Sequence, residues 1–249
     1  SVSTIEHAMA ALYAKGVDNC IIEVNAPEFP ILDGSAKAYV EAINQVGLEE
    51  QELPVEYYIV KSRQEVISED GRSRIILLPD SKFGVDVHIT FDSPVLSNQF
   101  ASLEDLKAFD SEVASCRTFV FVREVEQLLQ NNLIKGGDLD NALVIYDQPL
   151  EQEQIDRICD LMHVERKQGL ELGYINNAPI IFPNEPARHK LLDVLGDLAL
   201  IGRPIRGRII AFCPGHKINN EMGLKIRKEI KLNEAQAPLY DPNATPLLD

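Results

Sequence analysis

The sequence predicts an α+β fold for this chain of 249 residues. Short β-rich runs cluster between residues 55 and 91 and do not alternate strictly with helices. Helical patterns flank this cluster over residues 3–16, 36–45, 187–202 and 219–232. Hydrophobic residues make up 45% and charged residues 25% of the chain, which is ordinary for a globular protein with a sizeable core.

The N-terminal part is expected to form a helix, a strand and a second helix. Ser3 can cap the first helix, Glu6 follows three residues later as in a capping box, and Gly16 can end the helix. The run "NCIIEVNA" predicts a short strand, and "PILDGS" predicts a turn into the helix of residues 36–45. The polar stretch "GLEEQELP" is typical of a linker.

Beyond the linker, the runs "VEYYIVKS", "QEVISED", "SRIILLP" and "FGVDVHITF" predict strands, with a hairpin turn at Asp70-Gly71. "SLEDLKAF" and "REVEQLLQ" predict helices, "NALVIY" a strand, "QEQIDRICDLM" a helix or an irregular segment, and "ELGYINNAPIIFP" a return to β-structure. After the helix of residues 187–202, "GRIIAFCPGH" predicts a strand that runs into a turn. The proline-spotted residues 233–249 are expected to form a loose tail.

The charge balance argues against a nucleic-acid partner, because 39 acidic and 24 basic residues give a net charge of −15. The longest apolar runs are too short to cross a membrane, and no secretory signal opens the chain. The four cysteines are scattered without a metal-binding or disulfide spacing, which is typical of reduced thiols. We therefore expect a cytoplasmic protein with at most a peripheral contact to membranes.

The helix of residues 187–202 carries a row of polar residues, His189, Lys190, Asp193 and Asp197. At about 100° per residue these four share one arc of the helix, and apolar side chains occupy most of the rest. The row has two interpretations, a solvated polar stripe or an enclosed site. An imidazole and a carboxylate at positions i and i+4 can reach the same metal ion, which favours the site.

Glu6 and His7 leave similar alternatives open. Glu6 fits the capping box with Ser3, and a lone histidine at a helix end is most often structural. If His7 meets the helix of His189, the two histidines and Asp193 can form a zinc site with an open fourth position, which is typical of catalytic zinc. Glu6 is then a candidate base for the activation of water.

His216 follows a Pro-Gly pair after a predicted strand, where a tight turn can project a side chain into a cleft. It is a candidate general acid, with Asp197 as the group that orients it and keeps it protonated. We expect His88 and His163 to be structural. The run "GGDLD" lacks the spacing of a phosphate-binding loop, so it does not support nucleotide binding of that kind.

Four motifs together resemble the zinc-dependent UDP-3-O-acyl-N-acetylglucosamine N-deacetylases of lipid A biosynthesis in Gram-negative bacteria: "STIEHAMAALYAKGVDNCIIEVNAPEFPILDGSA", "CRTFVFVREVEQL", "ARHKLLDVLGDL" and "PGHKINN". The resemblance implies two similar α+β domains, each layering helices against a β-sheet, with the active site between them. Residues 1–52 are then the C-terminal part of a first domain that is incomplete at its N-terminus. Residues 53–232 form the second domain, and residues 233–249 form a tail or a linker to a fused 3-hydroxyacyl-carrier-protein dehydratase.

The resemblance also implies an activity, the hydrolysis of the 2-acetamido group of a UDP-linked, 3-O-acylated sugar with release of acetate. By motif position, zinc or iron(II) is held by His7, His189 and Asp193. The residues similar to the catalytic groups of the family are Glu6, Thr118, Lys190, Asp197 and His216.

Each of these residues has an implied role. Glu6 is similar to the base that activates water, and Thr118 to the donor of a hydrogen bond to the oxyanion. Lys190 is similar to the cation that supports substrate and transition state. His216 is similar to the group that stabilises the oxyanion and protonates the leaving amine, with Asp197 behind it.

The resemblance further implies an apolar passage for the acyl chain and an aromatic contact, Phe91, near the uridine. By position, the passage is lined by Phe119, Val122, Val125, Ile134, Gly137, Ala142 and Val144. Two alternatives stay open beside this interpretation. One is a zinc amidase that acts on another acylated amino sugar, and the other is a non-catalytic binding domain with a structural histidine cluster.

Overall fold

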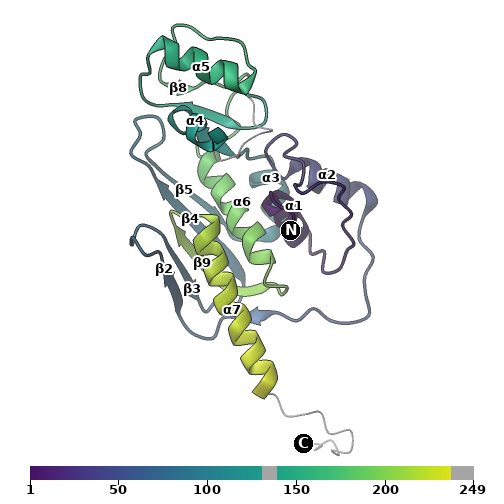
Figure 1. Cartoon of the computed structure of the whole chain (residues 1–249). Helices are drawn as coiled ribbons and strands as arrows, with labels where there is room; N and C mark the ends of the chain where they lie inside the picture. The colour runs from purple at the N-terminus through teal and green to yellow at the C-terminus, as the bar shows by residue number, and fades with distance from the viewer. Residues whose placement is uncertain (131–138, 237–249) are drawn as a thin grey trace, which may run out of the picture.

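The computed structural model describes residues 1–130 and 139–236 (Figure 1). The helices are α1 (Glu6–Ala14), α2 (Lys37–Val46), the 3-10 helix η1 (Leu106–Ala108), α3 (Phe109–Glu112), α4 (Val122–Gln130), α5 (Gln152–Met162), α6 (Glu185–Ala199) and α7 (His216–Gln236). The strands are β1 (Tyr58–Ile59), β2 (Gln64–Ile67), β3 (Arg74–Leu78), β4 (Phe83–Thr90), β5 (Asn98–Leu103), β6 (Phe119–Phe121), β7 (Leu143–Tyr146), β8 (Gly173–Tyr174) and β9 (Ile205–Phe212). The predicted α+β class is confirmed.

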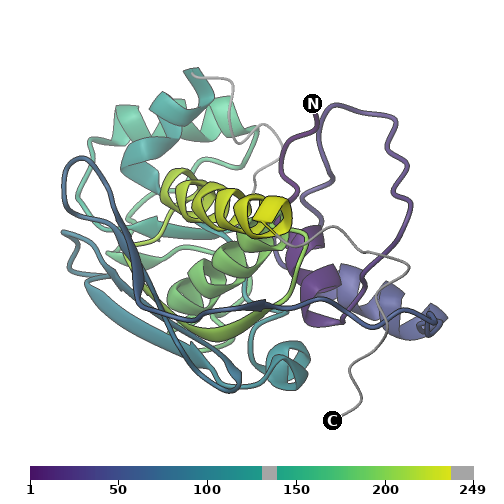
Figure 2. The ribbon, with the colours of Figure 1, turned by 90° about the horizontal axis from the view of Figure 1, so that it is seen from below.

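The main sheet has six strands, in the order β2-β3-β9-β4-β5, with β1 paired to the start of β9. The late strand β9 lies at its centre, antiparallel to β3 and parallel to β4. Successive side chains of a strand point to opposite faces of the sheet. In β9, Ile205, Ile209 and Ala211 are buried on the face that the helices cover, while Arg206 and Phe212 are exposed on the other face. Figure 2 shows α6 and α7 on the same face of this sheet.

Helix α6 is the centre of the molecule. It contacts α1 and α7 as well as β4 and β5. Twelve of its 15 residues are buried, so this helix is enclosed on nearly all sides rather than amphipathic at the surface. The enclosure rules out a solvated stripe, because His189, Asp193 and Asp197 are buried with the apolar residues.

A second, three-stranded sheet, β6-β7-β8, forms a small module with α4 and α5. This module lies at the top of Figure 1, beyond the N-terminal end of α6. It has its own apolar cluster of buried residues, Val122, Val125, Val144, Tyr146, Ile155, Ile158 and Cys159. The main cluster lies instead between the large sheet and helices α1, α6 and α7.

The start of α1 differs from the sequence prediction. Ile5 is its N-cap and gives no side-chain hydrogen bond, while the Ser3 hydroxyl donates to the carbonyl of Pro27 at 3.3 Å. The predicted capping box is therefore wrong. Thr4 turns the chain sharply, with φ of 56°, and this bend carries Ser3 away from the helix end. As a result the Glu6 side chain is not used as a cap.

The strand predicted for "NCIIEVNA" is also wrong. Within the described residues this region makes no ladder, and the nearest pairing is a single bridge between Ser3 and Glu28. Ile21 is 93% exposed, so the apolar side chains of this run have no layer to pack on in this chain. An apolar β pattern yields a strand only where a neighbouring strand accepts its hydrogen bonds.

Three further predictions differ in extent. The helix predicted for "SLEDLKAF" is replaced by the end of β5, the 3-10 turn η1 and the one-turn helix α3, because Ala101 and Leu103 pack into the core as a strand beside β4. The β-structure predicted for "ELGYINNAPIIFP" is limited to β8, and Ile181 is exposed. The last helix begins earlier, at His216, and continues to Gln236, and the rest of the predicted tail lies outside the described residues.

Candidate metal centre and active site

Two helices bring three possible metal ligands together. His7 comes from α1, and His189 and Asp193 lie one turn apart on α6. One potential ligand atom from each residue lies within 4.8 Å of the others, and all three side chains are buried. The His7 and His189 rings meet edge to face with centroids 5.0 Å apart. Among the described residues this is the one such cluster of histidine, cysteine and acidic side chains.

The hydrogen bonds of the two histidines show which ring atoms are free for a ligand. His189 Nδ1 lies 2.9 Å from the carbonyl oxygen of Cys116, and a carbonyl only accepts, so Nδ1 carries the proton. Its Nε2 then faces Asp193 Oδ1 at 3.3 Å. His7 Nδ1 is buried without a hydrogen-bond partner, which is costly unless something else binds it. Two imidazoles and a carboxylate fit a zinc or iron(II) ion.

Electrostatics favour the metal-binding protonation states of two of these candidate ligands, His7 and Asp193. Burial, reinforced by His189, lowers the pKa of His7 to about 4, so its imidazole is neutral near pH 7. Burial alone raises the pKa of Asp193, but the neighbouring Lys190, His189 and His216 together outweigh burial and hold that pKa well below its ordinary value. Lys190 Nζ lies 2.8 Å from Asp193 Oδ2. A neutral imidazole and an ionised carboxylate are the forms that bind metals.

Beside the cluster, Glu6 and His216 face each other across a small gap. His216 Nε2 lies 4.0 Å from Glu6 Oε1. The other ring nitrogen of His216, Nδ1, lies 2.9 Å from Asp197 Oδ2, which also accepts a 2.7 Å hydrogen bond from Asn219 Nδ2. The bond to Asp197 is the main cause that raises the pKa of His216 to about 9. Burial is the main cause that raises the pKa of Glu6.

Asn219 was not singled out from the sequence. It is fully buried on α7, three residues after His216, so both side chains leave the same face of the helix. The sequence signal was available in "PGHKINN", since the residue three positions after a candidate acid shares its helix face. What hid it was the predicted start of the helix at residue 219 itself.

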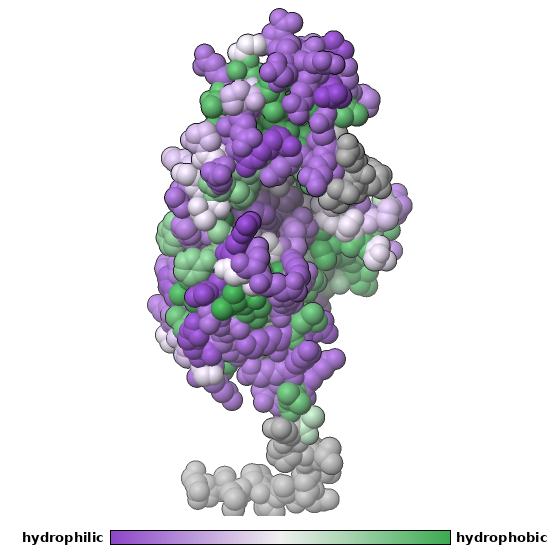
Figure 3. Space-filling view, turned by 60° about the vertical axis from the view of Figure 1, so that its left-hand side comes forward, coloured by the Kyte–Doolittle hydropathy of each residue, from purple (hydrophilic) through white to green (hydrophobic). Residues whose placement is uncertain are grey.

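A large apolar pocket opens from this gap. It has a volume of about 680 Å³, and Glu6, Thr118 and His216 line it together. From there it extends into the small module, between α4, α5 and β7, where Val125, Val144 and Ile155 are among its lining residues. Figure 3 shows one largely hydrophilic face of the molecule, with a recess between the lobe that contains α4 and α5 and the rest.

Comparison with known proteins identifies the family. The family described as UDP-3-O-acyl N-acetylglycosamine deacetylase matches residues 1–160 and 170–228. This chain belongs to that deacetylase family. No helix among the described residues of this family member is both long enough and apolar enough to cross a membrane.

Several curated relatives are similar to this chain. A bifunctional enzyme LpxC/FabZ of Porphyromonas gingivalis is 70% identical over 249 residues, which is 100% of this chain and 54% of the relative. One of Bacteroides thetaiotaomicron with the same name is 58% identical over 248 residues, again 100% of this chain and 54% of the relative. A UDP-3-O-acyl-N-acetylglucosamine deacetylase of Anaeromyxobacter sp. is 39% identical over 227 residues, covering 90% of this chain and 66% of the relative. The chain thus spans about half the length of the bifunctional relatives.

The pocket of this deacetylase-family chain contains most of the side chains predicted to line an acyl passage: Phe119, Val122, Val125, Ala142 and Val144. Two others, Ile134 and Gly137, lie outside the described residues. Helix α5 was not among the predicted lining, although its Ile155, Ile158, Cys159 and Met162 also line the pocket. Their helical spacing was visible, but only the fold places that helix over β7.

Phe91 does not line this pocket. Its ring packs at 5.7 Å from the ring of Phe119 and at 5.2 Å from that of Phe121, and Phe91 is partly buried against the main core. The structure therefore shows Phe91 as a supporting member of an aromatic cluster behind the pocket wall. The predicted contact with a uridine stays a prediction.

Proposed function

We propose that this chain forms the catalytic part of a zinc-dependent deacetylase. The reaction is hydrolysis of the N-acetyl group of UDP-3-O-(3-hydroxyacyl)-N-acetylglucosamine to acetate and the free amine, the committed step of lipid A biosynthesis. The single observation that carries the proposal is a convergence at one place. The buried cluster of His7, His189 and Asp193 lies beside the facing pair of Glu6 and His216, and a long apolar pocket opens at that pair.

The donor set supports zinc, with iron(II) as the alternative. His7, His189 and Asp193 offer two imidazole nitrogens and one carboxylate oxygen within 4.8 Å of one another, and the His7 ring makes no hydrogen bond through its buried Nδ1 that competes with this role. The chemistry that such an ion supplies is that of a Lewis acid, which lowers the pKa of water and polarises an amide carbonyl. Three protein ligands are typical of a catalytic rather than a structural site.

Glu6 and His216 divide the proton transfers. Glu6 accepts a proton from the attacking water, and its raised pKa makes the carboxylate a stronger base than an exposed one. His216 is protonated at neutral pH and donates its proton to the amide nitrogen as the carbon–nitrogen bond breaks. Asp197 fixes the ring of His216 and stabilises its charge through the Nδ1 hydrogen bond.

Thr118 and Lys190 meet the negative charge that develops on the carbonyl oxygen. Thr118 lines the pocket beside Glu6 and His216, so its hydroxyl can donate to that oxygen. Lys190 is held over the ring of Phe119, 5.4 Å from its centroid, by its ion pair with Asp193. A donor placed where charge develops contributes on the order of 3 kcal/mol to transition-state stabilisation.

The apolar pocket supports an acylated substrate. Its walls of valine, isoleucine and leucine suit a hydrocarbon chain, and burial of each methylene group contributes about 0.8 kcal/mol. The bifunctional names of two relatives support a fused dehydratase as the neighbour of this chain in its parent protein. The four cysteines are free thiols, which supports a reducing compartment, and we propose the cytoplasm as the place of the reaction.

The test is acetate release by the full-length protein from the acylated UDP-sugar and from the same sugar without the acyl chain. We expect turnover that depends on stoichiometric zinc, is abolished by chelation and returns with added zinc, and that strongly favours the acylated substrate. Equal rates on both sugars point to an amidase of other specificity. A protein that binds no zinc after reconstitution, and releases no acetate, is a non-catalytic binding domain.

Two variants distinguish the proposed proton-transfer residues from the proposed metal ligands. Glu6→Ala and His216→Ala are expected to lose turnover and keep zinc, because neither side chain belongs to the ligand cluster. His189→Ala is the comparison and is expected to lose zinc as well. Loss of the metal in Glu6→Ala or His216→Ala contradicts the division of roles.

A further inference from the structure

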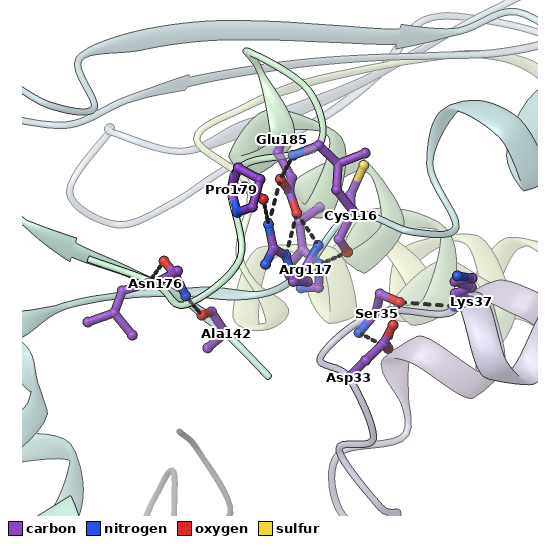
Figure 4. Close-up of polar contacts among 12 residues, drawn as sticks. Asp33, Ser35, Lys37, Cys116, Arg117, Ala142, Asn176, Pro179 and Glu185 are labelled. Atoms are coloured by element: carbon purple, nitrogen blue, oxygen red, sulfur yellow. Dashed lines mark hydrogen bonds and ion pairs between the residues drawn. The ribbon is translucent and has the colours of Figure 1, made fainter. Parts of the chain in front are cut away.

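A buried ion pair lies beside the candidate site without belonging to it. Arg117 and Glu185 are 7% and 0% exposed in their side chains, and their Nε and Oε1 atoms are 2.9 Å apart (Figure 4). The Glu185 carboxylate also accepts hydrogen bonds from the backbone N–H groups of Arg117 at 3.0 Å and Ile181 at 2.6 Å. Arg117 Nη2 donates in turn to the carbonyl of Pro179 at 2.7 Å.

The pair joins two segments that each carry part of the site. Glu185 is the first residue of α6 and lies one turn before the ligand His189, on the same face of the helix. Arg117 lies between Cys116 and Thr118. The pair thus bonds the helix of the candidate metal ligands directly to the segment that crosses the beginning of that helix.

Both neighbours of Arg117 act on the site. The Cys116 carbonyl accepts the Nδ1–H of His189 at 2.9 Å, which leaves Nε2 of that ring for a metal. Thr118 lines the pocket, and its backbone is held by a 2.8 Å bond from its N–H to the Gly34 carbonyl. A shift of the segment changes the His189 hydrogen bond and the Thr118 hydroxyl together.

We propose that Arg117 and Glu185 are positioning residues, which set the ring orientation of His189 and the place of Thr118 by fixing the 116–118 segment against the first turn of α6. This inference rests on the proposed function for its kinetic and Zn²⁺-affinity parts, while the orientation of the His189 ring is tested independently of it. Neither residue lines the pocket, so neither is expected to touch substrate. Outer hydrogen-bond partners of metal ligands typically change metal affinity or activity by about 10- to 100-fold when they are removed.

A neutral double variant tests the proposal without leaving one buried charge alone. Arg117→Met with Glu185→Gln removes the ion pair but keeps an amide oxygen near the backbone N–H of residue 117. The matched control is Arg208→Met with Asp86→Asn. That pair is also a two-bond arginine–carboxylate contact, with distances of 2.7 and 2.9 Å, but lies on the main sheet away from the pocket lining.

Four measurements are made on the full-length protein, with the single variant Arg117→Lys beside the two doubles. They are thermal unfolding, kcat and KM for acetate release, the Kd for Zn²⁺, and the NMR signal of the His189 Nδ1–H proton in metal-free protein. A hydrogen-bonded imidazole proton in a buried site exchanges slowly with water, and its assignment follows from its loss in His189→Gln. The kinetic and Zn²⁺ measurements depend on the proposed function, whereas thermal unfolding and the His189 proton signal do not.

We expect the double variant Arg117→Met with Glu185→Gln, the clamp variant, to lose the His189 proton signal and to bind Zn²⁺ about 10-fold more weakly. We also expect its kcat to fall about 10- to 100-fold while its KM changes less than threefold. Arg117→Lys keeps the positive charge but lacks the planar guanidinium group, so we expect its Zn²⁺ affinity and kcat to lie between those of the wild type and of the clamp variant. The sheet control is expected to keep all three properties. The proposal is overturned if the clamp variant keeps the His189 signal and a Zn²⁺ affinity within twofold of the control. If wild-type protein releases no acetate, the proposed function fails, while the His189 signal still decides the proposal.

Discussion

Gly196 of α6 lies directly against the backbone of Glu6 in α1. A Cβ atom on Gly196 would lie 2.1 Å from the carbonyl oxygen of Glu6 and 2.8 Å from its carbonyl carbon. No side chain other than hydrogen fits that space. The absence of a side chain therefore lets the two helices approach until His7 of α1 reaches His189 and Asp193 of α6.

We expect Gly196→Ala to damage the site more than the fold. The added methyl group forces α1 away from α6, and a displacement of about 1 Å in catalytic groups can lower kcat on the order of 100-fold. Overpacking of this kind also costs about 1–3 kcal/mol of stability. The matched control is Gly223→Ala in α7, where the new Cβ meets only Ile201 at 3.8 Å. Acetate release and thermal unfolding of both variants check this, and equal kcat in the two contradicts it.

The pH profile should report the contact between His216 and Asp197. In the proposed mechanism His216 acts in its protonated form, so we expect activity to fall as pH rises through its pKa of about 9. Asp197→Asn removes the main cause of the raised pKa, and the alkaline limb of kcat/KM should move down toward the ordinary value of 6.5. At pH 8 the protonated fraction falls roughly 30-fold. The measurement is kcat/KM from pH 5 to 10, and a limb that stays near pH 9 in the variant removes Asp197 from this role.

The acyl passage can be shortened from within. Val144 is buried in β7 and lines the pocket, so Val144→Phe is expected to fill space that the proposed acyl chain would occupy. Exclusion of two methylene groups costs about 1.6 kcal/mol, roughly 15-fold in kcat/KM for the acylated sugar. The sugar without an acyl chain serves as internal control and should change less than twofold. A parallel loss on both substrates shows a general disturbance instead.

Thiol labelling tests how dry the region around His189 is. Cys116 is fully buried, and burial raises the pKa of its thiol to about 12, so the reactive thiolate is absent at pH 8. Cys20 is exposed. We expect a maleimide to label Cys20 in the native protein and Cys116 only after denaturation, as read by peptide mass spectrometry. Rapid native labelling of Cys116 contradicts the close packing of the segment that carries it.

The elements that the sequence predicts correctly are those whose residue spacing is set by the local backbone geometry of a strand or a helix. "NALVIY" is a short apolar run of the kind that forms a strand buried on both faces, and "REVEQLLQ" has the apolar spacing of a helix; both are present, as β7 and α4. The predictions that are wrong concern elements that need a hydrogen-bond partner elsewhere in the chain. The run "NCIIEVNA" has the pattern of a strand but no neighbour in the described chain, and the capping box of Ser3 and Glu6 is broken by the bend at Thr4.

The sequence by itself determined which residues have the chemistry for a metal centre, because a histidine and a carboxylate one helical turn apart are fixed neighbours at His189 and Asp193. The tertiary structure decided that His7 joins them, since that contact crosses more than 180 residues and requires the close approach at Gly196. It also decided the pKa of His216 and the clamp between Arg117 and Glu185. Burial and long-range hydrogen bonds set these properties, and neither is encoded in local spacing.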